Sequence, residues 1–413
     1  MTGTSGSWRT LGSHLRWLAG ESDRLLSFAE GSLHPAGGFA YLDEHGVPDL
    51  AHPVETYSTA RMTHVYSLAA LMGRPGAGPL ADVGLAALTG RLHDDAHGGW
   101  FGAVGTDGPV QDRKQAYEHA FVVLAASSAA AAGRGGARAL LTEALGVLER
   151  RFWREDEGML AESWDAGWTE LEAYRGMNAN MHGVEAMMAA ADVTGDKVWL
   201  DRAARVVEHA VHRSAAGDGW RLVEHHDPQW RQLRDYNTDD RGHQFRPYGV
   251  TVGHLMEWAR LTLHLRAALG DRAPNWALPD AQTLFDTAVA DGWAVDGAEG
   301  FVYTVDFDGR PVVRERMHWV LAEAIGAAAA LHEVTGEDRY EQCYRRWWDH
   351  AAAHFLDREG GSWWHELSPD LRPSATVWQG KPDVYHALQA TLVPRLPLAP
   401  SFATALAARL LRN

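Results

Sequence analysis

The chain has 413 residues, of which 46% are hydrophobic and 22% are charged, a composition typical of a folded globular protein. Its formal net charge of −16 argues against a nucleic-acid partner, because phosphate binding requires clustered Lys and Arg. The single cysteine, Cys343, cannot form an internal disulfide, which fits a reducing compartment.

The start of the chain predicts a cytoplasmic protein. Residues 1–10 (MTGTSGSWRT) lack the basic start and the apolar run of a signal peptide. We also expect no membrane contact, since no apolar stretch approaches the roughly 20 residues that span a bilayer. The length alone is compatible with one large repeat-built domain or with two ordinary domains.

A Gly-rich turn next to an aromatic or apolar residue recurs along the chain and indicates an internal repeat. The turns are about 60 residues apart, except for a gap of about 80 residues before the fifth. Their anchor glycines are Gly38, Gly99, Gly158, Gly219, Gly300 and Gly361.

Between these turns the sequence predicts pairs of helices. Residues 81–95 and 137–153 have apolar residues at i, i+3, i+4 and i+7, the pattern of a helix with one polar face. Residues 119–132 and 183–195 are apolar nearly all round, as in a buried helix. Strand signals are weak, and the alternation in residues 301–309 predicts only a short hairpin. We therefore predict an all-α, single-domain (α/α)6 barrel of six inner and six outer helices over residues 1–413.

Polar residues recur near the start of each predicted inner helix, where an apolar helix should not carry them. Several are spaced i, i+3 or i, i+4, so that each pair shares one helix face. If the inner helices start at the same end, these groups surround one cavity. They are Arg61 and His64, Tyr117 and His119, Asn178 and His182, His254 and Glu257, His318 and Glu323, and Tyr385 and His386. Of these, His64 and His119 are the most readily explained as core residues.

The residue types in this set favour proton-transfer chemistry. Histidine gives or takes a proton near neutral pH, and two histidines across a cavity suit removal of a proton beside a carbonyl. Arg61 would stabilise the resulting enediolate, and Glu257, one turn from His254, would fix the tautomer of that histidine. Asn178 and His182 would hold substrate hydroxyls.

The sequence contains no HExxH motif and no Cys/His metal-ligand spacing, so we predict no metal and no cofactor. Residues 224–227 (EHHD) remain as a remote alternative metal site.

Four segments of the chain resemble the N-acylglucosamine 2-epimerase superfamily. They are NANMH (178–182), FRPYGVTVGHLMEWARL (245–261), MHWVLAEA (317–324) and GKPDVYHALQA (380–390). The resemblance extends from about residue 10 to residue 395. It implies an (α/α)6 barrel that interconverts sugars without a metal, with His254 and His386 as acid and base and Arg61 at the mouth of the barrel. Further substrate contacts are expected from Asn178, His182, Tyr117, His119, Trp319, Glu323 and Asp383.

The family contains two reactions, and PDVYHALQA resembles its aldose–ketose isomerase branch. The resemblance therefore implies interconversion of D-mannose and D-fructose, with D-lyxose and D-xylulose as a further pair. Isomerisation of sulfoquinovose and 2-epimerisation of N-acylglucosamine or cellobiose remain alternatives within the family. Outside it, the rivals are a glycosidase using Asp239 and Asp240, and a non-catalytic carbohydrate-binding protein. The sequence leaves the oligomeric state open, and the loop 226–248 is expected to cover the cavity.

Overall fold

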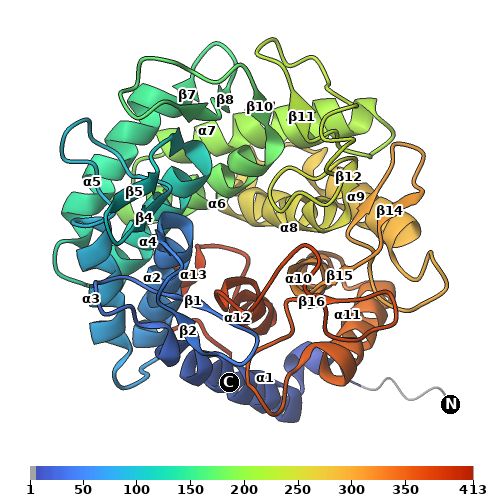
Figure 1. Cartoon of the computed structure of the whole chain (residues 1–413). Helices are drawn as coiled ribbons and strands as arrows, with labels where there is room; N and C mark the ends of the chain where they lie inside the picture. The colour runs from blue at the N-terminus through green and yellow to red at the C-terminus, as the bar shows by residue number, and fades with distance from the viewer. Residues whose placement is uncertain (1–5, 413) are drawn as a thin grey trace, which may run out of the picture.

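The computed structural model describes residues 6–412, whose helices form two concentric layers around a central axis (Figure 1). The inner layer contains α2 (Thr56–Leu71), α4 (Ala116–Ala131), α6 (Met177–Thr194), α8 (Val252–Leu269), α10 (His318–Thr335) and α12 (Tyr385–Leu392). The outer layer contains α1 (Gly12–Ala29), α3 (Ala77–Leu88), α5 (Ala137–Val147), α7 (Val198–Val207), α9 (Ala277–Gly292) and α11 (Asp338–His350). The prediction of an all-α (α/α)6 barrel is confirmed. The prediction of one domain over residues 1–413 also covers residues 1–5 and 413, which lie outside the described residues.

Burial differs between the two layers as the apolar patterns predicted. In α4, 14 of the 16 residues are buried, and its many alanines allow close approach of α2 and α6. In α7 the buried residues form one stripe: Trp199, Leu200, Ala203, Val206 and Val207. No helix within residues 6–412 combines the length and the apolar character needed to cross a membrane.

The ring closes between the beginning and the end of the chain. Each inner helix contacts the next, and α12 contacts both α10 and α2. Each inner helix from α2 to α10 also packs against the outer helix that follows it, whereas α12 packs against α1 (Figure 1). The last described helix, α13 (Phe402–Ala407), packs against α2, α4 and α6.

Short antiparallel strands hold the starts of the inner helices at one end of the barrel. Five of them directly precede an inner helix, and each pairs with a strand in the following turn region: β3 (Val54–Glu55) with β4 (Ala103–Gly105), β6 (Lys114–Gln115) with β9 (Ser163–Trp164), β10 (Arg175–Gly176) with β11 (His225–His226), β12 (Val250–Thr251) with β13 (Thr304–Val305), and β15 (Arg316–Met317) with β16 (Glu366–Leu367). The remaining strands are β1 (Tyr41–Leu42), β2 (Pro48–Asp49), β5 (Gly108–Gln111), β7 (Trp153–Arg154), β8 (Met159–Leu160) and β14 (Pro311–Val313). A hairpin was predicted over residues 301–309; β13 does pair with β14, but β14 lies just beyond this range.

The recurring turns need glycine for their backbone conformation. All six anchor glycines have φ between 63° and 98°, a region that residues with a Cβ rarely adopt. At Gly99 space is limiting as well, because a Cβ would lie 2.7 Å from the Trp168 ring and 2.8 Å from His119 Nε2. At Gly99 the glycine therefore also lets the turn pack directly against Trp168 and His119.

Candidate active site

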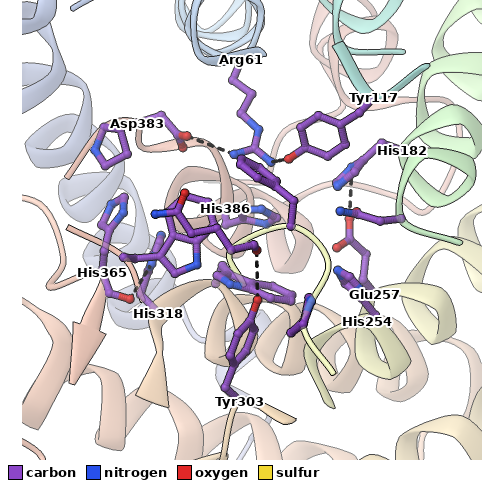
Figure 2. A pocket seen from close by; sticks show the side chains of 17 residues that line it. Arg61, Tyr117, His182, His254, Glu257, Tyr303, His318, His365, Asp383 and His386 are labelled. Atoms are coloured by element: carbon purple, nitrogen blue, oxygen red, sulfur yellow. Dashed lines mark hydrogen bonds and ion pairs between the residues drawn. The ribbon is translucent and has the colours of Figure 1, made fainter. Parts of the chain in front are cut away.

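The first turns of all six inner helices surround one cavity of about 580 Å³, counting its open mouth (Figure 2). Nine of the eleven predicted site residues line it: Arg61, Tyr117, Asn178, His182, His254, Glu257, Trp319, Asp383 and His386. The paired strands explain this convergence, because they bring the starts of inner helices to the same end of the ring.

His119, which was expected to contact substrate, does not line this cavity. Its Nδ1 donates to the Gln115 carbonyl oxygen over 2.6 Å, and its Nε2 accepts from the Trp100 backbone N–H over 3.3 Å. Two residues along a helix rotate a side chain by about 200°, so Tyr117 faces the cavity while His119 faces the Gly99 turn. His119 is therefore a core residue that fastens this turn to α4.

His254 is held by a carboxylate that the sequence did not single out for this role. Its Nδ1 lies 2.9 Å from Glu224 Oε1, and both side chains are buried. A carboxylate only accepts, so Nδ1 carries the proton and Nε2 is left free to act as a base. The predicted role of Glu257 in fixing this tautomer is therefore wrong, and Glu224, just before β11, takes its place.

His386 has a similar arrangement. Its Nδ1 lies 3.0 Å from Glu323 Oε1, and the other oxygen of Glu323 accepts from Arg260 Nε over 2.7 Å. Burial, followed by the positive charge of Arg61, lowers the pKa of His386 well below its usual value. Glu323 thus lies behind His386, where it orients the imidazole without lining the cavity.

Glu257 lies where two buried groups of potential ligands meet. Glu257 forms one group of potential metal ligands with His182 and Glu185, and a second group with Glu323 and His386. Within each group of three, one ligand atom per residue lies within 4.8 Å of the other two. Arg260 contributes a positive charge here, 3.5 Å from Glu257. Burial and the nearby Glu323 raise the pKa of Glu257 well above its usual value, against the opposing effect of Arg260. The absence of a metal requirement stays a prediction.

Arg61 is the one Lys or Arg side chain among the residues described as lining the cavity. Its Nη1 lies 3.1 Å from Asp383 Oδ2, and its Nη2 donates to the Tyr117 hydroxyl over 2.8 Å (Figure 2). Burial alone would raise the pKa of Asp383, but Arg61 holds it below its usual value. The pair is therefore charged on both sides, which fixes the guanidinium at the cavity.

The loop 226–248, which was expected to cover the cavity, reaches it near the end of the loop. Gln244, Phe245 and Pro247 line the cavity, and the Phe245 ring makes edge contacts with Tyr117 and with Trp378. Gln244 Nε2 donates to the Val377 carbonyl oxygen over 2.8 Å, which ties this loop to the loop before α12.

A second cavity adjoins the first and shares Tyr117, Asn178 and Phe245 with it. Glu118 and Glu162 are buried in its wall. Burial raises the pKa of Glu118 to about 8, and its Oε2 has no partner among the described residues. The neighbouring space is therefore polar and acidic.

Several lining residues were not predicted as substrate contacts, namely Gln244, Phe245, Pro247, Tyr303, His318, His365, Trp378 and Pro382. Most of them lie on loops, where no helical period marks them. His318 did belong to the recurring polar set. The carboxylates proposed for a glycosidase, Asp239 and Asp240, are exposed in the covering loop and do not line the cavity.

Comparisons with known proteins agree over nearly the whole chain. Residues 37–390 match the family model described as N-acylglucosamine 2-epimerase (GlcNAc 2-epimerase). A D-mannose isomerase of Thermobifida fusca is 58% identical over 402 residues, covering 97% of this chain and 98% of that protein. A D-mannose isomerase of Pseudomonas cannabina pv. alisalensis is 50% identical over 407 residues, covering 98% of each. A crystal structure described as D-mannose isomerase superposes with a TM-score of 0.85 at 28% identity, covering 91% of this chain and 96% of that one.

Proposed function

The chain belongs to the N-acylglucosamine 2-epimerase family, and within it we propose that it is an aldose–ketose isomerase that interconverts D-mannose and D-fructose. The relatives at 58% and 50% identity, both named D-mannose isomerase, support this substrate pair. The observation that carries the chemistry is the pair of imidazoles at one cavity, each with a carboxylate behind it: Glu224 behind His254 and Glu323 behind His386.

In the proposed reaction, Nε2 of His254 removes the proton from C2 of the open-chain aldose. The C–H electron pair forms the C1–C2 double bond of a cis-enediol, and the carbonyl oxygen O1 takes up a proton. His254 then returns its proton to C1 while O2 loses one, which gives the ketose. His386 would carry protons between the oxygens and assist ring opening. Arg61 would stabilise the negative charge that develops on O1 and O2.

The charge of the cavity favours a neutral sugar. Arg61 is already paired with Asp383, so it offers little surplus charge to a sulfonate such as that of sulfoquinovose. Glu257, Asn178 and His182 all line the cavity and would bind sugar hydroxyls through hydrogen bonds. We further propose a cytoplasmic location, which the single Cys343 supports.

A sugar 2-epimerase is the second candidate, because two opposed bases also suit removal and return of the C2 proton on opposite faces. We would incubate EDTA-treated protein with D-mannose in heavy water and follow the products by NMR. D-Fructose with deuterium incorporation is expected from a metal-independent isomerase. D-Glucose as the first product would replace the isomerase proposal by a 2-epimerase. Activity that is lost with EDTA and restored by a divalent cation would contradict metal independence.

A further inference from the structure

One wall of the cavity carries two histidines that the proposed reaction does not use. His318, the first residue of α10, and His365, just before β16, stack with their ring centroids 3.8 Å apart. Both line the cavity and both are buried. Figure 2 shows them together on the side of the cavity away from His254 and Glu257.

Contacts between aromatic rings connect this part of the wall with the two proposed bases. The His254 ring centroid lies 5.2 Å from that of Trp319, which lies 5.8 Å from that of His386. The His386 centroid in turn lies 6.5 Å from that of His318. Figure 2 shows His386 between His254 and His318, so that His318 lies beyond both proposed bases.

Hydrogen bonding determines which nitrogen of His318 is free. Its Nδ1 lies 3.3 Å from the His365 carbonyl oxygen, and because a carbonyl only accepts, Nδ1 carries the proton. Burial lowers the pKa of His318 to about 4, so the ring is neutral at neutral pH and Nε2 is an acceptor. This Nε2 is buried without a partner among the described residues. A buried acceptor left without a donor is unfavourable, so a donor is expected from a bound ligand.

We propose that Nε2 of His318 accepts a hydrogen bond from a hydroxyl at the far end of the sugar, on C4 or C6, and that His318 thereby determines specificity. This inference rests on the proposed function, which places C1 and C2 of the sugar at His254. With the reacting carbons there, the carbons furthest from them lie toward the opposite end of the row of rings. The stacked His365 and the backbone hydrogen bond hold the imidazole in place before substrate arrives, so that little ordering is required on binding.

The test compares His318→Leu and His318→Gln with the wild type on D-mannose, 4-deoxy-D-mannose and 6-deoxy-D-mannose. Leu removes the acceptor at similar volume, whereas the Gln amide oxygen retains one near the position of Nε2. We expect His318→Leu to lower kcat/KM for D-mannose roughly tenfold. On the deoxy sugar that lacks the contacting hydroxyl, the same variant should lose less than twofold. His318→Gln should recover most of the activity on D-mannose.

A loss of equal size on all three sugars would overturn the inference, because a merely structural role affects every substrate alike. Thermal unfolding of each variant shows whether such a uniform loss comes from damage to the fold. A wild-type protein that leaves D-mannose unchanged would overturn the proposed function itself. This outcome is distinct from a His318→Leu variant whose loss of kcat/KM is the same on every sugar.

Discussion

Replacing Glu224 by Gln tests whether the carboxylate behind His254 contributes to the chemical step. The two groups are 2.9 Å apart, with side chains only 9% and 4% exposed. In the proposed reaction His254 takes up the C2 proton. Its positive ring is then attracted to the carboxylate by about 4 kcal/mol, for charge centres about 4 Å apart at an effective dielectric constant of about 20. Gln keeps an acceptor at the same place but loses this attraction. Because desolvation offsets part of the attraction, we expect kcat to fall about 10²- to 10³-fold.

The assay is fructose formation at saturating D-mannose, with KM measured in parallel. Since Glu224 does not line the cavity, KM should change by less than about threefold. Asp280→Asn is the matched control, because Asp280 forms a similar 2.8 Å contact with His212 on the outside of the barrel. This control should leave kcat unchanged. A Glu224→Gln enzyme that keeps kcat within fivefold while its KM rises would refute the reasoning.

Three further predictions concern the stability of the protein and the loop residue Phe245 at the cavity. Glu118→Gln should raise the free energy of unfolding by more than ~1 kcal/mol at pH 8 and leave it unchanged at pH 4, as measured by urea unfolding. The reason is that burial raises the pKa of Glu118 to about 8 in the folded protein. The wild type is therefore most stable below the ordinary carboxyl pKa and loses stability as the pH rises through the pKa of the folded state. An equal gain at both pH values would indicate better packing instead. Gly99→Ala should cost about 2–4 kcal/mol, because it combines positive φ with a collision against Trp168. The control Gly98→Ala has positive φ but no atom within 4 Å and should cost about 1 kcal/mol, so equal costs would show that crowding at Gly99 is unimportant. Phe245→Ala should raise KM for D-mannose about tenfold with little change in melting temperature, since Phe245 packs over the cavity against Tyr117 and Trp378; an unchanged KM would argue against its role as a cover.

The repeat made most of the fold predictable from the sequence. Glycines at a near-constant spacing marked the turns, and the contrast between amphipathic and wholly apolar helices separated the outer layer from the inner one. Polar residues such as Arg61, His254 and His386 could be found because they interrupt buried helices at equivalent positions. The packing of α1 against α12 follows from closure of the ring, and no local sequence pattern predicts it.

The carboxylates behind His254 and His386 were harder to predict. Glu257 is one turn from His254 in sequence, yet the hydrogen bond goes to Glu224, which lies 30 residues away and next to a two-residue strand. His119 repeats the pattern of the other inner helices but faces outward, because its position in the helix differs by two residues from that of Tyr117. The positions of loop residues such as Phe245 and His365 depend on tertiary packing. Loops have no periodic sequence pattern from which these positions could be predicted.

The closure of the ring has a consequence for the synthesis of this protein on the ribosome. Arg61 and Asp383, which meet at the cavity, are separated by 322 positions in the chain. At translation rates of about 5–20 residues per second, on the order of 15–65 s pass between their appearances. During that interval α2, and α10 once it has been made, lack the contacts that α12 later provides. Protection by chaperones is therefore most valuable just before the sixth inner helix is made. The cavity, whose lining includes Asp383 and His386, is among the last parts of the molecule to form.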